Sequence, residues 1–240
     1  MTIQNDHTVR SYDEELVHLI NLIARMGGLA EAGFEGALKA VAKRDSELAS
    51  RIIAGDAEID TLESDIHAFT VRLLALRQPV AQDLRLIVGA LKVSGDLERI
   101  GDYAANVAKR AIILNELPPV KPTAGIPRLG RLVQSMVRDV LDAYVGRDND
   151  RAVRVWHQDQ EVDDMYTSLF RELITYMMED PRNITPCTHL MFIAKNIERI
   201  GDHATNIAET VHFLIEGEGI RENRPKGESI LPQSFDPGSE

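Results

Sequence analysis

Oxygen-bearing side chains recur at helical spacing in two copies of one short motif. Residues 98–102, Glu-Arg-Ile-Gly-Asp, reappear unchanged as residues 198–202, and an asparagine follows four residues after the aspartate in each copy. Residues four apart lie on the same face of a helix. Carboxylate and amide oxygens are the ligands that magnesium, manganese, calcium or ferric iron prefer. The spacing therefore predicts two metal-binding stripes, Glu98, Asp102 and Asn106 in one copy and Glu198, Asp202 and Asn206 in the other.

A second acidic helix is expected beside each stripe. Its aspartates are Asp56 and Asp60 in the first copy and Asp159 and Asp163 in the second. Two acidic faces repel each other unless positive charge lies between them, so we expect these aspartates to complete the metal sites. Two other interpretations stay open: an ordinary solvated helix face, or a surface that binds basic partners without metal. Arg99 or Arg199 would also neutralise part of the charge.

Helical periodicity runs through long segments of the chain, whereas strand-like alternation is nearly absent. Proline and glycine positions divide these segments into helices. The expected helices cover about residues 12–44, 45–78, 80–115, 127–146, 148–180 and 185–216. Asp45 and Thr185 are predicted to be N-caps. The pair Gly27 and Gly28 is expected to weaken or bend the first helix.

The chain repeats one unit twice. Matching residues recur at an offset of 103 in the first two helices of each unit, as in Asp45 and Asp148, and at an offset of 100 in the third, as in Gly101 and Gly201. This repeat predicts an all-α protein made of two tandem three-helix bundles. Residues 10–116 form the first bundle, 117–125 a proline-rich linker, 126–217 the second bundle and 218–240 a disordered tail. The glycines of the repeated motif predict close approach of a neighbouring helix.

Composition excludes several classes of protein. The 27 basic and 38 acidic residues give a formal charge of −11, which argues against a nucleic-acid partner. The single Cys187 excludes a disulfide framework. No uninterrupted apolar stretch approaches membrane-spanning length, and the N-terminus lacks the pattern of a signal peptide. We therefore expect a cytoplasmic protein without a membrane span.

Two longer stretches resemble the PhoU family of phosphate-uptake regulators. The first is Arg-Gln-Pro-Val-Ala-Gln-Asp-Leu-Arg at residues 77–85, followed by Leu-Glu-Arg-Ile-Gly-Asp at 97–102. The second is Glu-Asp-Pro-Arg-Asn-Ile-Thr-Pro at 179–186, followed by Ile-Glu-Arg-Ile-Gly-Asp-His-Ala at 197–204. The resemblance extends over about residues 10–217 and implies two three-helix bundles in a cytoplasmic homodimer.

The resemblance also implies a function. It implies a negative regulator of phosphate-starvation signalling, an adaptor rather than an enzyme, whose partners are a sensor histidine kinase and the ATPase subunit of the phosphate ABC transporter. The family's metal motif falls on Glu98 and Asp102 and on Glu198 and Asp202, with iron, manganese, magnesium or zinc as the implied ion. Where family members often carry a further acid, this chain has Asn106 and Asn206.

Two enzyme interpretations stand beside the adaptor. One is a phosphohydrolase that uses a carboxylate-bridged pair of metals. The other is a ferritin-like di-iron centre, because Glu-x-x-His pairs occur at Glu15 and His18 and at Glu209 and His212. These pairs do not match each other in the repeat, which counts against a shared centre. Trp156 is expected in the core or between the bundles.

Overall fold

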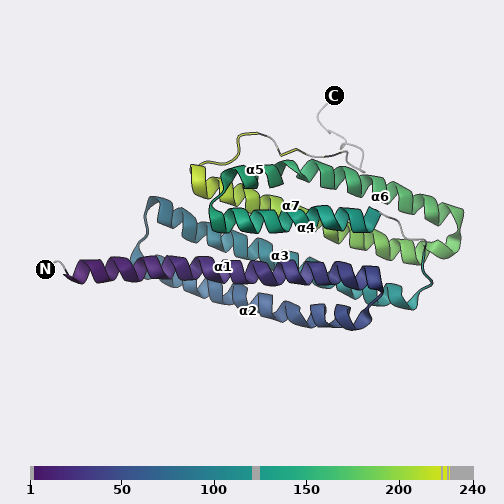
Figure 1. Ribbon diagram of the computed structural model, residues 1–240, viewed down its shortest axis with the longest axis horizontal. Coiled ribbons are helices and arrows are strands. Elements are labelled where there is room, and N and C mark those ends of the chain that lie inside the picture. The colour runs from purple at the N-terminus through teal and green to yellow at the C-terminus, as the bar shows by residue number, and fades with distance from the viewer. Residues whose placement is uncertain (1–2, 121–124, 223, 226, 228–240) are drawn as a thin grey trace, which may run out of the picture.

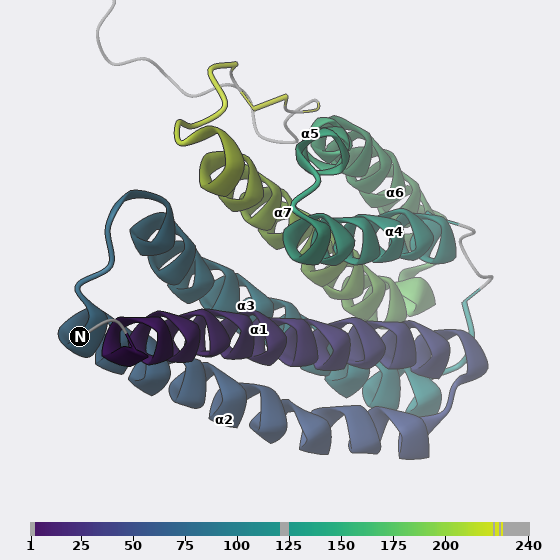
Figure 2. The same cartoon turned by 60° about the vertical axis from the view of Figure 1, so that its left-hand side comes forward.

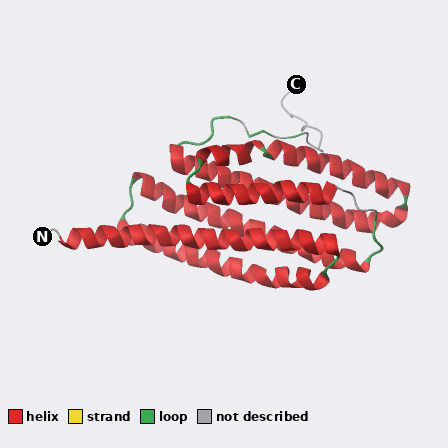
Figure 3. Ribbon diagram, in the orientation of Figure 1, coloured by secondary structure: helices red, strands yellow, loops and turns green. Residues whose placement is uncertain are grey.

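The chain folds into long helices joined by short turns (Figure 1). The structure, a computed structural model, describes residues 3–120, 125–222, 224, 225 and 227. The helices are α1 (Ile3–Lys43), α2 (Ser46–Arg77), α3 (Ala81–Glu116), α4 (Gly125–Gly146), α5 (Asn149–His157), α6 (Asp159–Glu179) and α7 (Ile184–Glu216), with a 3₁₀ turn at Pro181–Asn183. No strand occurs in the described part of the chain, which confirms the all-α prediction (Figure 3). None of the described helices is both long and apolar enough to cross a membrane.

Two three-helix bundles pack against each other, as the repeat predicts. The first bundle is α1, α2 and α3, and the second is α4, the α5–α6 rod and α7. α3 and α7 lie side by side between α2 and α6, and α1 contacts α4 (Figure 2). The expected core stripes on α3 and α7 are buried, including Ile100 and Ala104 in one bundle and Ile200 and Ala204 in the other. Residues 97–107 and 197–207 therefore present one apolar face inward and an acidic face beside it.

The repeat-related helix starts agree closely with the sequence. Asp45 caps α2 by accepting a hydrogen bond from the Leu48 amide at 2.9 Å, and Asp148 caps α5 through the Arg151 amide at 2.9 Å. The cap predicted at Thr185 is wrong, because α7 begins one residue earlier and follows directly from the 3₁₀ turn. Asn183 occupies the N-cap position without a side-chain cap bond. The preceding turn supplies the geometry that a cap would otherwise set.

The helix predicted over 148–180 is interrupted at Gln158. This residue keeps right-handed helical angles (φ −72°, ψ −13°), but its N–H bonds to Val155 O in the tighter 3₁₀ pattern. Asp159 follows directly and is buried, with 2% of its surface exposed. The interruption therefore lies beside a buried carboxylate, and periodicity alone does not report such a local change of hydrogen-bond pattern.

The glycine pair in α1 does not interrupt the helix. α1 continues through Gly27 and Gly28, and a Cβ atom at position 27 would collide with the side chain of Leu141 in α4. The repeat-related contact mirrors it: a Cβ at Gly130 would lie 2.7 Å from Leu38 Cδ2. Leu38 and Leu141 are themselves repeat partners. The glycines thus form a pseudo-symmetric contact between the bundles, and packing of a distant leucine outweighs their low helix propensity.

Arg44 and Arg147, one residue before the two capping aspartates, adopt left-handed backbone angles (φ 53° and 51°). The left-handed conformation costs a non-glycine residue about 1–2 kcal/mol, and a glycine at the same position avoids this cost. Glycine in turn lowers the stability by about 0.5–1 kcal/mol, because it increases the conformational entropy of the unfolded chain. Arg147→Gly is therefore expected to raise the free energy of unfolding by roughly 0.5 kcal/mol. Urea unfolding of the metal-free protein measures the change.

Arg44→Gly is the matched comparison. Arg44 Nη2 donates to Leu114 O, Asn115 O and Leu117 O at 2.8, 3.0 and 2.7 Å, whereas Arg147 makes no hydrogen bond to the described residues. Losing these bonds is expected to cost about 1 kcal/mol or more, so Arg44→Gly should destabilise the protein. Equal effects at the two positions would contradict this account.

Candidate metal sites

The first acidic cluster lies where α2 packs against α3. We define it as Asp56 and Asp60 on α2 with Glu98, Asp102 and Asn106 on α3. Burial raises the pKa of Asp56, and the charges of Asp102 and Asp60 raise it further. Burial also raises the pKa of Glu98, followed by the charge of Asp102, while Arg99 opposes the shift. The fold therefore brings carboxylates of both helices within electrostatic reach of one another.

Gly101 permits this approach. A Cβ atom at position 101 would lie 2.8 Å from Ile59 Cδ1 and 3.0 Å from Asp56 Oδ1. At Gly201 a Cβ would lie 3.3 Å from Val162 Cγ1 of α6. The neighbouring helix thus passes over the glycine in each bundle, which confirms the close approach predicted from the motif.

The cations of the first cluster are largely solvated. Arg99 Nη1 lies 3.1 Å from Asp102 Oδ2 and its Nε lies 3.3 Å from Glu98 Oε2, but 55% of the arginine side chain is exposed. Lys109 Nζ donates to Asn106 Oδ1 at 3.4 Å. Exposed ion pairs contribute about 0–1 kcal/mol, so the four carboxylates keep an excess of negative charge.

The second acidic cluster lies where α6 packs against α7. We define it as Asp159 and Asp163 on α6 with Glu198, Asp202 and Asn206 on α7. The pKa of Asp163 is raised by burial and by the charges of Asp159 and Asp202. The pKa of Glu198 is also raised by burial, although Lys195 Nζ donates to its Oε1 at 2.7 Å and opposes the shift. The fold therefore brings the four acids of this copy within electrostatic reach of one another.

An arginine from the C-terminal segment occupies the second cluster. Arg224 donates from Nε to Asp159 Oδ2 and from Nη2 to Asp159 Oδ1, both at 2.7 Å. Its Nη2 also reaches Asp202 Oδ1 at 2.7 Å, and its Nη1 reaches Asn206 Oδ1 at 3.2 Å. Three of the five predicted ligands thus hold a guanidinium. Thr205 Oγ1 adds a further donor to Asp159 Oδ1 at 3.1 Å.

The second cluster is less solvated than an ordinary exposed helix face. Glu198 of the stripe and Asp159 of the neighbouring helix are buried, with 8% and 2% of their surfaces exposed. The Asp202 side chain is 40% exposed, so this stripe is only partly solvated.

Two residues of the predicted disordered tail, Arg224 and Gly227, contact the second cluster, whereas Glu218 and Arg221 of the same segment are exposed. The rest of that prediction, residues 223, 226 and 228–240, lies outside the described residues. A low apolar content predicts that a segment does not pack through hydrophobic contacts. It does not predict whether one charged side chain of that segment pairs with a buried acid.

Asn206 also connects the two bundles. Its Nδ2 donates to Asp96 Oδ1 of α3 at 3.3 Å, and His203 Nδ1 lies 2.8 Å from the same oxygen. His203 stacks on Tyr103 of α3, with 5.7 Å between ring centroids. The second cluster therefore borders the interface between bundles.

Four residues at the second cluster were not predicted from the sequence: Arg224, Thr205, Lys195 and Asp96. Comparison of the two repeats could have found two of them, because Thr205 replaces Ala105 and Lys195 replaces Gly95 at the matching positions. These differences add donors to the second cluster only. No repeat signal exists for Arg224, which lies beyond the second unit.

The carboxylates fit a cation by their chemistry. They offer hard oxygen ligands, and their mutual repulsion is what a bound cation would offset. Within the described residues, no group of three or more histidine, cysteine or acidic side chains already stands in the arrangement of a metal site. Arg99, Lys195 and Arg224 hold these oxygens instead, so side chains must turn before they ligate an ion.

Neutralising one acid of the first cluster is expected to stabilise the metal-free protein. Glu98→Gln and Asp56→Asn each remove a carboxylate whose pKa is raised by burial and by like charge. We expect each to raise the free energy of unfolding by about 0.5–1 kcal/mol at pH 7. Asp65→Asn, at an exposed position of α2, is the matched control and should change it little.

The pH dependence has a definite sign. A raised pKa means that the folded state binds the proton more tightly than the unfolded state, so this carboxyl group stabilises the fold at low pH. That stability is lost as the pH rises from the ordinary glutamate value of 4.5 through the raised value. Glu15 and Asp180, whose pKa values are lowered by arginine partners, act in the opposite direction. The test is therefore the difference between Glu98→Gln and the wild type across this window; equal pH dependence would contradict it.

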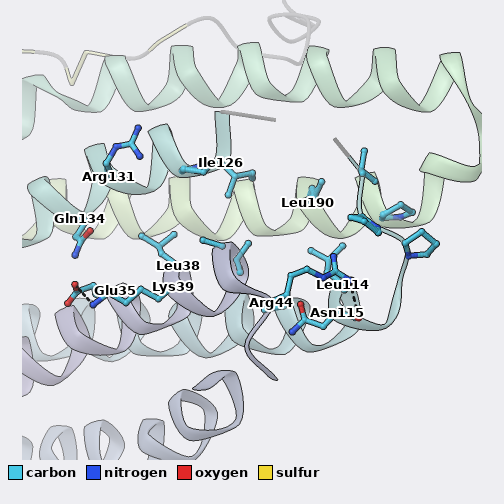
Figure 4. A pocket seen from close by; sticks show the side chains of 18 residues that line it. Glu35, Leu38, Lys39, Arg44, Leu114, Asn115, Ile126, Arg131, Gln134 and Leu190 are labelled. Atoms are coloured by element: carbon cyan, nitrogen blue, oxygen red, sulfur yellow. Dashed lines mark hydrogen bonds and ion pairs between the residues drawn. The ribbon is translucent and has the colours of Figure 1, made fainter. Parts of the chain in front are cut away.

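A cavity of about 520 Å³ lies apart from both clusters (Figure 4). It opens between α1, the end of α3, the linker and the starts of α4 and α7, with Leu38, Ile126 and Leu190 among its walls. Lys39 at its rim pairs with Glu35 at 2.6 Å, and Arg44 is engaged with backbone carbonyls. None of the ten predicted ligands lines it.

The Glu-x-x-His pairs have other partners. Glu15 accepts from Arg77 Nε at 2.8 Å, and His18 packs edge-on against Phe69. Glu209 accepts from Trp156 Nε1 at 3.0 Å, and His212 Nδ1 lies 2.9 Å from Asn149 Oδ1. Each pair thus stabilises its own bundle. Trp156 is buried, with 2% exposed, as expected for a core residue.

Known proteins share this sequence and fold. The PhoU domain matches residues 23–111 and 126–211. A phosphate-specific transport system accessory protein PhoU homolog from Caulobacter vibrioides is 55% identical over 222 residues, which cover 92% of this chain and 96% of that protein. The homolog from Xylella fastidiosa (strain 9a5c) is 53% identical, with 98% and 99% covered.

A crystal structure of PhoU from Pseudomonas aeruginosa has the same architecture. It superposes with a TM-score of 0.84 at 42% identity, over 86% of this chain and all of that one. The two matched domains coincide with the two helical repeats that carry the acidic clusters. On this sequence identity, coverage and fold, the chain is a member of the PhoU family.

Proposed function

We propose that this chain is a negative regulator of phosphate uptake and phosphate-starvation signalling. It would act as a homodimeric, cytoplasmic adaptor between the ATPase subunit of the phosphate ABC transporter and a sensor histidine kinase. Its similarity to accessory proteins of the phosphate-specific transport system, along nearly the whole chain, supports this role. The adaptor does not require a catalytic centre.

The two acidic clusters support a metal-binding part of this role. Each presents four carboxylates and an asparagine from two helices of one bundle. A bound iron, manganese, magnesium or zinc ion would supply positive charge there. Asp56, Asp60, Glu98 and Asp102 would hold it in one bundle, and Asp159, Asp163, Glu198 and Asp202 in the other. The single observation that carries the proposal is this duplicated acidic site within a PhoU fold.

The second cluster suggests how binding of a cation could change the contact between the two bundles. Asn206 contacts both Arg224 and Asp96 of the opposite bundle. An adaptor needs two arrangements whose balance a ligand shifts, and the ligand must bind them with different affinity. A cation that displaces contacts of Asn206 would act on the contact between bundles.

A clean deletion of the gene tests the regulatory role. We expect phosphate-starvation genes to stay expressed in phosphate-rich medium, and a plasmid copy of the wild type to restore repression. Reporter expression in both media is the measurement. Normal repression in the deletion strain, with no second copy of the gene present, would contradict the proposal.

An assay of the purified protein tests the alternative that the chain is a metal-dependent phosphohydrolase. A chromogenic phosphate ester should not be hydrolysed in the presence of manganese or iron. Turnover that disappears in Asp202→Ala would favour a phosphohydrolase over an adaptor.

A further inference from the structure

We propose that the second acidic cluster is an arginine-binding site that Arg224 fills from the same chain, and that Arg224 and a divalent cation exclude each other there. This competition rests on the metal-binding part of the proposed function. The arginine site itself does not, because it is built from contacts of the chain with itself.

The cluster holds the guanidinium with a fitted set of acceptors. Asp159 receives two parallel hydrogen bonds from Arg224 at 2.7 Å, the bidentate geometry that matches a planar guanidinium to a carboxylate. Asp202 accepts a third at 2.7 Å and Asn206 a fourth at 3.2 Å. Asp159 is 3% exposed at its side chain, and a buried carboxylate without a partner is costly. The arginine is therefore the counter-ion of a desolvated acid.

A second contact secures the segment beyond the arginine. The Gly227 amide donates to Asp163 Oδ2 at 3.1 Å. A Cβ at this position would lie 2.6 Å from Asp163 Cβ and 3.0 Å from the Asp164 backbone nitrogen. Only glycine fits against the α6 backbone at this distance. Arg224 and Gly227 thus bind neighbouring acids of the same cluster.

A cation needs the oxygens that Arg224 occupies. Asp159 Oδ1 already accepts from Arg224 and from Thr205, while Asp159 Oδ2 and Asp202 Oδ1 both accept from Arg224. A guanidinium and a divalent ion at these atoms would also repel each other. The apparent affinity for the ion is therefore the intrinsic affinity multiplied by the fraction of molecules in which the arginine has left.

The first cluster differs in this respect. Ala105 stands in the first cluster at the position that matches Thr205 in the repeat. The arginine of the first cluster, Arg99, lies on the surface with 55% of its side chain exposed. No segment of the described chain inserts a buried arginine there. A divalent ion should therefore fill the first cluster at lower concentration than the second.

Manganese titration of the full chain tests the competition. Asp102→Ala removes a ligand of the first cluster, and in this background the electron paramagnetic resonance of free Mn²⁺ reports the second cluster. Arg224→Gln should raise its affinity at least about tenfold, since an arginine docked in nine molecules of ten lowers it by that factor. Arg221→Gln is the matched control, because among the described residues this exposed arginine pairs with Glu218 and not with the cluster, so its loss should leave the affinity unchanged.

Hydrogen exchange at the Gly227 amide tests the arginine site without any metal. We expect slow exchange in the wild type and in Arg221→Gln, and fast exchange in Arg224→Gln and Gly227→Val. Saturating Mn²⁺ should make the wild-type amide exchange fast. Fast exchange in the metal-free wild type would overturn the arginine site. Equal Mn²⁺ affinity of Asp102→Ala with and without Arg224→Gln would overturn the competition.

The two proposals fail in different ways. If no variant binds Mn²⁺ but the Gly227 amide is protected only when Arg224 is present, the arginine site stands while the competition and the metal-binding role are overturned. If repression is normal in the deletion strain, the regulatory role fails, and the exchange and titration results still decide the site.

Discussion

The double substitution Asp102→Ala and Asp202→Ala is expected to lower the metal content of the purified protein by at least about tenfold. Losing only an outer partner of a metal ligand typically costs 10–100-fold in affinity, and losing a ligand costs no less. Each aspartate is the common neighbour of its cluster: Asp102 acts on Asp56 and Glu98, and Asp202 acts on Asp163 and Glu198. Elemental analysis of protein purified without chelator gives the metal content.

The fold should survive this change. The side chains of Asp102 and Asp202 are 39% and 40% exposed, and substitutions at such positions usually cost little. Removing Asp202 leaves Arg224 paired with buried Asp159. Circular dichroism should therefore show unchanged helix content.

A charge-matched control separates ligand loss from loss of negative charge. Asp65→Ala with Glu161→Ala removes two exposed acids from the same acidic helices, outside both clusters. This control should keep its metal. If it loses as much metal as the test variant, or if the test variant unfolds, the assignment of the clusters as metal sites is contradicted.

Trp156→Ala is expected to be the most destabilising single substitution considered, at about 3–5 kcal/mol of unfolding free energy. Trp156 is buried in the short helix α5, and its Nε1 donates to Glu209 on α7 at 3.0 Å. Alanine would leave a large cavity and an acid without its donor. Urea unfolding followed by circular dichroism measures the loss.

Two further variants divide this effect into its causes. Trp156→Phe keeps most of the ring but removes the donor, so we expect a smaller loss of about 1–3 kcal/mol from the unpaired Glu209. His157→Ala removes the exposed neighbour whose ring meets Trp156 edge-on, and should stay within about 0.5 kcal/mol. A loss below 1 kcal/mol for Trp156→Ala would show that α5 is not anchored through this side chain.

The local rules of helix formation account for most of the elements predicted from sequence. Asp45 works as a cap because its hydrogen bond to the Leu48 amide lies within one turn of the helix. The continuous helix expected across Gln158 and the cap expected at Thr185 were wrong. At Gln158 the hydrogen-bond pattern changes beside the buried Asp159, and before Thr185 a 3₁₀ turn leads directly into α7, one residue earlier than predicted.

The same distinction between local and tertiary causes applies to the candidate metal sites. The sequence by itself determined that each copy carries Glu98, Asp102 and Asn106, or their counterparts, on one helix face, because the helical period fixes which residues share a face. The repeat also determined that two such sites exist, each beside an acidic partner helix.

Only the tertiary structure decided how each site is neutralised. The period of a helix is set by local hydrogen bonds, but its rotation and its distant neighbours are set by packing summed over the whole core. That packing buries Asp159 and Glu198, brings Asp96 across from the other bundle and places Arg224 between Asp159 and Asp202. Charges that lie far apart in sequence meet because a buried acid requires a partner, and no spacing rule encodes which residue supplies it.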